Sequence, residues 1–152
     1  MSAEAALRAL GITLPEPAAP VASYVPYTRD GSLVFVSGQL PIRDGALPRT
    51  GLVGANVSQE EAIEEARACA VNVLAQLRAA AGSLDDVARI LKLTVFVASA
   101  PGFRAQPVVA NGASELMVEV FGEAGKHARA AVGVAELPLG APVEVDAVAA
   151  VR

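Results

Sequence analysis

A long amphipathic segment over residues 58–82 limits the folds that are open to this chain. It begins with Ser-Gln-Glu-Glu, in which Ser58 and Glu61 have the spacing of a capping box, and Gly82 is a typical C-terminal stop. One face is apolar at helical spacing and consists of Ala62, Ala66, Cys69, Ala70, Val73 and Leu77. The charged residues that lie elsewhere are Glu64, Glu65 and Arg78. The segment therefore predicts a helix that covers a core with one side.

Strands and a second helix are predicted on both sides of this segment. The first two strands, over 21–27 and 33–37, are joined by a turn at 28–32 that contains Asp-Gly, a strong hairpin signal. The remaining elements are an apolar strand over 88–98, a helix over 107–121, and two closing strands over 128–135 and 142–151. The order β-β-α-β-α-β-β predicts an α+β protomer, a mixed sheet with two helices on one face. The uncovered face indicates a partner subunit.

The first twenty residues have a different character from the rest. A short helix over 3–10 is followed by Gly11, which ends it, and by a stretch that contains Pro15, Pro17 and Pro20. We expect residues 1–20 to consist of this short helix and a Pro-rich arm, which lies over a surface. Residues 21–152 are expected to form a single domain.

Composition excludes several classes of protein. The longest stretches without charge, 17–28 and 31–42, are shorter than the roughly 20 apolar residues of a membrane-spanning helix, so no membrane partner is expected. A net charge of −4 argues against a nucleic-acid surface. One cysteine and one histidine allow neither a disulfide within the chain nor a Cys/His zinc site. Because no signal peptide is visible, we expect a cytoplasmic protein.

Arg129 is the first candidate for a functional side chain. On the predicted strand it shares a face with Ala131 and Gly133, so little bulk stands beside it. Small neighbours leave room for a small ligand, and the planar guanidinium suits a carboxylate. A structural ion pair with an acidic residue is the alternative.

Two carboxylates on the last predicted strand are the next candidates. Glu144 and Asp146 share one face, where either carboxylate could orient water or act as an acid or base. Either could equally pair with Arg129. Cys69 is interpreted as a small core residue, and His127 as a residue without a serine or cysteine partner, which argues against a catalytic triad.

Several blocks of this sequence together resemble the RidA/YjgF family of small trimeric imine deaminases. They are FVSGQLP at 35–41, ARACAVNVLAQL at 66–77, HARAAVGVAELP at 127–138 and PVEVDAVAAV at 142–151. The resemblance implies a chorismate-mutase-like trimeric barrel, with helices outside and ligand clefts between adjacent subunits. The partners it implies are a small carboxylate-bearing substrate and two further copies of the chain.

The same resemblance assigns roles to individual residues. Arg129 matches the family's carboxylate-binding arginine, and Glu144 matches the glutamate that places the attacking water. The pocket residues that it implies are Tyr24, Gly38, Ala131 and Ser114. Ala131 stands where archetypal members have cysteine, so only its backbone N–H could serve there. Ser114, rather than Asn111, stands near the position of the family's pocket asparagine.

The activity implied by the resemblance is hydrolysis of a reactive enamine or imine. A 2-aminoacrylate or 2-iminopropionate substrate would give a 2-oxo acid and ammonia, and no metal or organic cofactor is expected because the imine is already activated. Two other functions stay open: a trimeric binding or stress-protective module without turnover, and an endoribonuclease. The acidic charge and the lone His127 argue against the endoribonuclease.

Overall fold

The structure is a computed structural model that describes residues 1–17, 19 and 23–152. Its helices are α1 (Ala3–Ala9), α2 (Gln59–Ala81) and α3 (Gln106–Phe121), and its short 3-10 helices are η1 (Leu84–Asp86), η2 (Gly122–Gly125) and η3 (Pro138–Gly140). Its strands are β1 (Tyr27–Asp30), β2 (Leu33–Gln39), β3 (Val87–Ala98), β4 (Ala128–Val134) and β5 (Val143–Val151). After α1, the elements follow the predicted order β-β-α-β-α-β-β.

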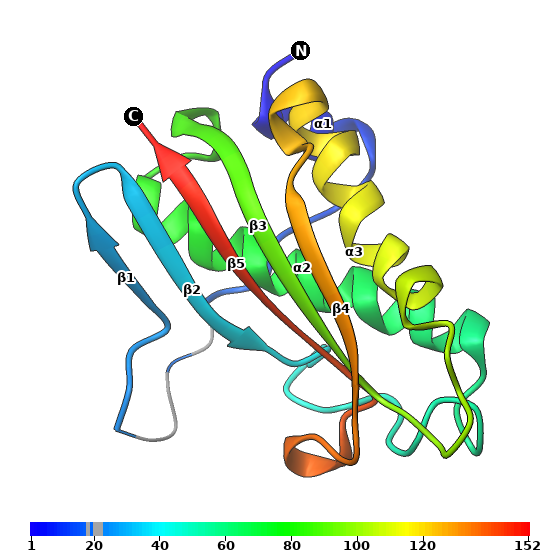
Figure 1. Cartoon of the computed structure of the whole chain (residues 1–152). Coiled ribbons are helices and arrows are strands. Elements are labelled where there is room, and N and C mark those ends of the chain that lie inside the picture. The colour runs from blue at the N-terminus through cyan, green and yellow to red at the C-terminus, as the bar shows by residue number, and fades with distance from the viewer. Residues whose placement is uncertain (18, 20–22) are drawn as a thin grey trace.

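The five strands form one mixed sheet in the order β1-β2-β5-β3-β4. Neighbouring strands are antiparallel except for β3 and β4, which run parallel because α3 connects them as a crossover helix. In Figure 1, α2 passes behind the strands and α3 runs beside β4, so that both helices lie on one face of the sheet. The α+β fold with a mixed sheet and two helices on one face is confirmed.

The long helix α2 begins and ends as the sequence predicts. The Ser58 side chain accepts a hydrogen bond from the Glu61 amide, and the Glu61 side chain accepts one from the Ser58 amide, which completes the capping box. Gly82 follows the helix with φ 90°, a conformation that favours glycine. All six residues of the predicted apolar stripe are buried, and they pack on the inner face of the sheet.

Cys69 belongs to this stripe and has no exposed surface. Its Sγ lies 3.5 Å from the backbone oxygen of Val143. Burial, and then the negative charges of Glu65 and Glu144, raise the pKa of the thiol well above its ordinary value. A thiol that stays protonated inside a core is a packing residue and no nucleophile, as the sequence predicted.

The hairpin differs from its prediction. The first strand covers 27–30 instead of 21–27, and the turn narrows to Gly31 and Ser32. Gly31 has φ 60°, which lets the chain reverse within two residues. Positions 20–22, which include Pro20 of the predicted arm and the predicted start of this strand, lie outside the described residues.

The N-terminal helix α1 contributes to the core. Leu7 is 1% exposed and joins the main apolar cluster. Glu4 pairs with Arg78 at 2.6 Å and accepts a hydrogen bond from the Leu84 amide. Burial opposes ionisation of Glu4, but these bonds outweigh it, and the net pKa of Glu4 is lowered. The helix therefore connects α2 with η1.

Glu65 corrects the expectation that it lies away from the core with Glu64. Its side chain is 0% exposed, forms a hydrogen-bonded ion pair with Arg43, and lies 3.6 Å from Nε of Arg49. Both arginines come from the 40–57 connection that precedes α2. A buried carboxylate needs such partners because removal from water is costly. Glu65 thus fixes this long connection to α2.

Within residues 1–17, 19 and 23–152, no helix combines the length and the apolar character needed to cross a bilayer.

We predict that Glu65→Ala lowers the free energy of unfolding by about 2–4 kcal/mol, because it removes the shared partner of Arg43 and Arg49 and leaves a cavity at a fully buried position. Urea denaturation measures the change. The matched control is Glu64→Ala, whose side chain is 67% exposed and lies 3.5 Å from Arg49, and which should cost less than about 1 kcal/mol. Equal effects of the two substitutions would contradict the role given to Glu65.

Candidate functional site

Arg129 lies on the edge strand β4, and its half-buried side chain turns toward α3. Its Nη1 donates to Asn111 Oδ1 at 2.8 Å and to Ser114 Oγ at 3.1 Å, and its Nη2 donates to the backbone oxygen of Pro107 at 3.3 Å. Asn111 and Ser114 are three residues apart and therefore share a face of the helix. The guanidinium is held by neutral groups, all of them from α3.

These three bonds leave part of the guanidinium free. Arginine has five N–H groups, two on each Nη and one on Nε. Among the described residues, the Nε hydrogen and one Nη2 hydrogen of Arg129 have no acceptor, and none of the ion pairs includes this residue. Two free N–H groups on a planar cation match the two oxygens of a carboxylate. The ion pair considered as an alternative is not formed within the described chain.

Ser114 also contacts His127, which precedes β4. The Oγ of Ser114 lies 2.9 Å from Nε2, and the Nδ1 of the same imidazole lies 2.6 Å from the backbone oxygen of Gly125. The interpretation that His127 lacks a serine partner was therefore wrong. A hydrogen-bonded row runs from Arg129 through Ser114 and His127 to Gly125.

Glu144 is in the middle of the sheet, on β5. Its half-buried carboxylate shares the outer face with Asp146, as the alternation along the strand predicted. Burial, and to a smaller extent the charge of Asp146, raise the pKa of Glu144. A raised pKa suits a carboxylate that takes a proton from water.

Arg129 and Glu144 lie on opposite faces of the sheet of one protomer. Arg129 is in register with Leu93, which is buried under the helices, whereas Glu144 is in register with Phe96 on the outer face. Neighbours in register point to the same side of a sheet. The guanidinium and the carboxylate therefore do not pair within one chain.

Gly38 lies next to Glu144. It sits where the β2–β5 register shifts between Val36 and Gln39, and a Cβ on it would come 2.5 Å from Oε1 of Glu144. Gly38 also lines a cavity of about 380 Å³ with Tyr24, a residue that is 51% exposed, and Glu144 is not among the lining residues. The structure thus brings Arg129 together with Ser114, and Glu144 together with Gly38, whereas Tyr24 only shares a cavity with Gly38.

Ala131 follows Arg129 on the same side of β4. It is half-buried and packs against the core cluster. Gly133 continues this side, and a Cβ there would come 2.8 Å from Nε2 of Gln106. The side of β4 that carries Arg129 therefore continues with small residues only, as the alternation along the strand predicted.

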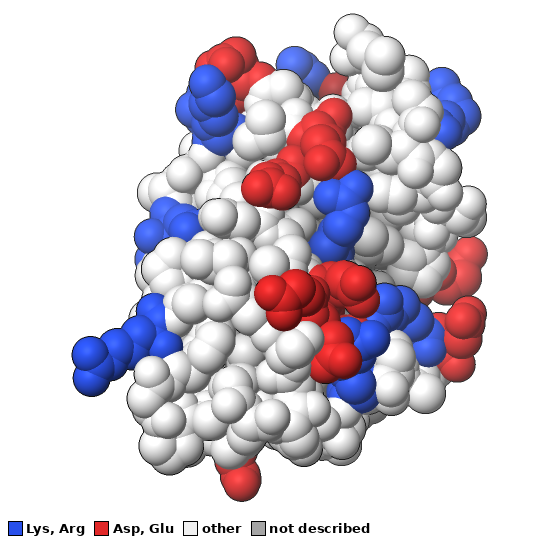
Figure 2. All heavy atoms as spheres, turned by 90° about the vertical axis from the view of Figure 1, so that its right-hand side faces the viewer, with Lys and Arg blue, Asp and Glu red and all other residues white. Residues whose placement is uncertain are grey.

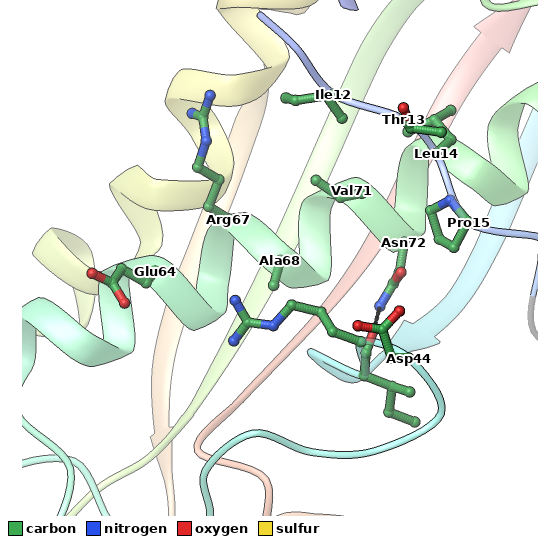
Figure 3. A pocket seen from close by; sticks show the side chains of 12 residues that line it. Ile12, Thr13, Leu14, Pro15, Asp44, Glu64, Arg67, Ala68, Val71 and Asn72 are labelled. Carbon is green, nitrogen blue, oxygen red and sulfur yellow. Dashed lines mark hydrogen bonds between the residues drawn. The ribbon is translucent and has the colours of Figure 1, made fainter.

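A larger groove lies elsewhere, between the N-terminal segment and the outer side of α2 (Figure 3). Its volume is about 720 Å³, and it contains none of the predicted site residues. The arginines at its rim are already paired, Arg43 with Glu65 and Arg67 with Glu119. Size alone therefore does not identify the candidate site.

The surface on the side of α3 and β4 carries charges of both signs. In Figure 2, acidic and basic side chains alternate in small groups between broad uncharged areas, and no basic stripe crosses this face. A path for a nucleic-acid backbone needs clustered lysines and arginines.

The fold defines the class of protein. A mixed five-stranded sheet with two helices on one face is shared with solved structures of YjgF-type proteins. A family model described as "YjgF/chorismate mutase-like, putative endoribonuclease" matches residues 4–150. The chain belongs to this family.

Three relatives illustrate the range of names within it. "Protein TCP17" of Trypanosoma cruzi is 54% identical over 142 residues, 93% of this chain and 89% of that protein. The crystal structure of a "putative endoribonuclease" from Shewanella oneidensis has a TM-score of 0.96 at 34% identity and covers 99% of this chain and 100% of that one.

The third relative is "Putative reactive intermediate deaminase TdcF" of Escherichia coli, 33% identical over 131 residues, 85% of this chain and 87% of that protein. Its crystal structure "with bound serine" has a TM-score of 0.65 at 29% identity and covers 90% of this chain and 93% of that one. The family is therefore established, while its members carry different names.

Two residues at this site were missed from the sequence. Asn111 was set aside in favour of Ser114, yet both contact the guanidinium because they lie one turn apart on α3. His127 was judged alone, although it stands two residues before Arg129, at the spacing that places side chains on one side of a strand. That spacing was the available signal.

We predict that Glu144→Gln raises the free energy of unfolding at neutral pH. Folding raises the pKa of Glu144, so its contribution to stability is present below the ordinary glutamate range of about 4.3 and is lost as the pH rises through the raised pKa. Glutamine removes this loss. Urea denaturation at a series of pH values should show the gain at neutral pH and none below about pH 4. A less stable variant at neutral pH would contradict the prediction.

Proposed function

We propose that this protein is a hydrolytic deaminase of reactive enamine and imine intermediates of the 2-aminoacrylate and 2-iminopropionate type. The observation that carries the proposal is the free fork of Arg129, by which we mean its Nε hydrogen and one Nη2 hydrogen. Asn111 and Ser114 accept hydrogen bonds from Nη1 and so fix the guanidinium. A 2-imino acid presents a carboxylate beside an electrophilic C=N group, which this fork would bind and orient. The relative named as a reactive intermediate deaminase, solved with serine bound, supports an amino-acid-like ligand.

We further propose that the complete site forms between copies of the chain in a homotrimer. Arg129 and Ser114 of one copy would face Glu144 and Gly38 of another, because the two groups lie on opposite faces of a single sheet. Exposed apolar side chains on the outer face support self-association: Leu33 is 38%, Phe35 47% and Val132 41% exposed. Burial of this face would bring a second copy to Glu144.

The proposed reaction uses only these groups and water. Arg129 holds the substrate carboxylate, and Glu144 takes a proton from a water molecule whose oxygen adds to the imine carbon. The C=N electron pair moves to nitrogen, which takes the proton from Glu144, so that a carbinolamine forms. Glu144 then takes the hydroxyl proton and passes it to the amino group as the C–N bond breaks, so that ammonia leaves and the 2-oxo acid remains. Each step balances without oxidation or reduction.

An endoribonuclease is the second candidate, because the family description and the Shewanella relative carry that name. The net charge of −4 and the mixed charges in Figure 2 weigh against it. Phosphate contacts would make RNA binding fall steeply with salt, so a salt titration separates the two candidates. A module that only binds carboxylates would bind at Arg129 without turnover.

We predict that Arg129→Ala lowers kcat/KM for 2-iminopropionate hydrolysis by at least about a hundredfold, because two charge-assisted hydrogen bonds to the carboxylate are lost. The imine is generated in situ, and its decay is followed against the decay in buffer. Arg129→Lys keeps the charge but loses the fork, so its rate should fall between those of alanine and wild type.

The matched control is Arg67→Ala, which removes an arginine of α2 that pairs with Glu119. Its rate should equal that of the wild type. A wild-type protein that does not accelerate 2-iminopropionate hydrolysis would refute the proposed deaminase. Pyruvate binding that is undiminished in Arg129→Ala would refute the role of Arg129 as the carboxylate-binding residue.

A further inference from the structure

The imidazole of His127 is held at both nitrogens, and one of its partners also touches the carboxylate anchor. Nδ1 lies 2.6 Å from the Gly125 oxygen, and Nε2 lies 2.9 Å from Ser114 Oγ. The same Oγ accepts a hydrogen bond from Arg129 Nη1 at 3.1 Å. The proposed deaminase reaction does not use this histidine.

The direction of these hydrogen bonds follows from the chemistry of the partners. A carbonyl oxygen can only accept, so Nδ1 of His127 carries a hydrogen whether the ring is neutral or protonated. In the neutral ring, Nε2 is an acceptor and takes the hydroxyl hydrogen of Ser114. The lone pairs of Ser114 then face Arg129, and the hydroxyl has no hydrogen left for a ligand.

Protonation of the ring reverses one of these bonds. Nε2 becomes a donor, so Ser114 Oγ must accept hydrogen bonds from His127 and Arg129 at once. The hydroxyl hydrogen of Ser114 then no longer points at His127 and can donate to another acceptor. Two cations then share one oxygen, which is unfavourable without an anion nearby. A carboxylate bound at the free N–H groups of Arg129 supplies the negative charge that this pair of cations needs.

We infer that His127 is a positioning residue of the carboxylate site and acts through Ser114, so that carboxylate binding and protonation of His127 favour each other. The inference rests on the proposed function, because it takes Arg129 as the carboxylate anchor. Such coupling is reciprocal: a lower pH tightens binding, and bound carboxylate promotes protonation.

Charged residues lie beside His127 in the sequence and on the elements that pack around the start of β4. They are Lys126 and Arg129 beside it in sequence, Glu115 and Glu119 on α3, Glu123 on η2, and Arg89 and Lys92 on β3. Lys126 pairs with Glu123, Glu119 pairs with Arg67, and Arg89 donates to the Lys126 oxygen. Carboxylates, lysines and arginines ordinarily keep one charge between about pH 6 and pH 8, whereas an imidazole does not.

The first test measures binding of pyruvate, a 2-oxo acid that remains ionised over this range, by calorimetry at about pH 6 and about pH 8. We expect the wild type to bind about tenfold more tightly at the lower pH. Ser114→Ala and His127→Asn should each lose this ratio, and Ser114→Thr, which restores a hydroxyl, should regain it. Ser32→Ala, an exposed serine in the β1–β2 turn, is the matched control and should keep the ratio of the wild type.

The second test uses the fact that the chain has one histidine, so that imidazole NMR signals need no assignment. Nitrogen shifts should show the hydrogen of the neutral ring on Nδ1. Saturating pyruvate should move the titration of the ring to higher pH in the wild type and leave it in place in Ser114→Ala. A hydrogen on Nε2, or an equal shift in both proteins, would overturn the inference.

The outcomes separate this inference from the deaminase. Pyruvate binding that depends on pH through Ser114, without imine turnover, would sustain the inference and refute the deaminase. Pyruvate binding with a pH-independent affinity would refute the inference alone. Pyruvate that fails to bind at either pH would overturn the inference, whereas the deaminase is refuted only by the absence of imine turnover.

Discussion

The pairing of β3 with two neighbours decides how the rest of the molecule is arranged. Its parallel register with β4 places Arg129 beside Leu93, and its antiparallel register with β5 places Glu144 beside Phe96. Because successive strand residues alternate between faces, the guanidinium lies under α3 and the carboxylate faces outward. A slip of one residue in either register would exchange the faces and separate each side chain from its present neighbours.

Close packing of the two long helices gives the arginine its support. Gly112 on α3 lies against the backbone of Ile63 on α2, where a Cβ would overlap the carbonyl group. The absence of a side chain there lets α3 pack closely on α2, which fixes the distance of Asn111 and Ser114 from β4. The packing of the two helices therefore determines which groups can accept hydrogen bonds from Arg129.

Local patterns predicted the fold well because the physics behind them is local. The capping box at Ser58, the stop at Gly82 and the alternation along β5 all depend on residues close in sequence, and all are confirmed. The start of β1 was misplaced because pairing with β2, and not composition, determines it. Glu65 was misassigned because its partners, Arg43 and Arg49, come from a connection without periodicity.

The surroundings of single residues could be predicted, but their arrangement could not. The alternation along β4 indicated that Arg129 has only small neighbours on its side of the strand, yet its separation from Glu144 depends on strand order and register, which no single strand encodes. The bond between Ser114 and His127 required the path of the chain through α3 and η2 into β4. A resemblance could supply roles, but hydrogen-bond partners came only from tertiary structure.

The absence of a side chain at Gly38 can be used in the design of new activities. Its φ is not in the left-handed region, so alanine fits the backbone, and the three atoms nearest to an added methyl group all belong to the side chain of Glu144. A methyl group there would push that carboxylate sideways while leaving its carbon chain and its acidic group intact. A substitution at position 38 could therefore move the carboxylate of Glu144 without replacing the glutamate.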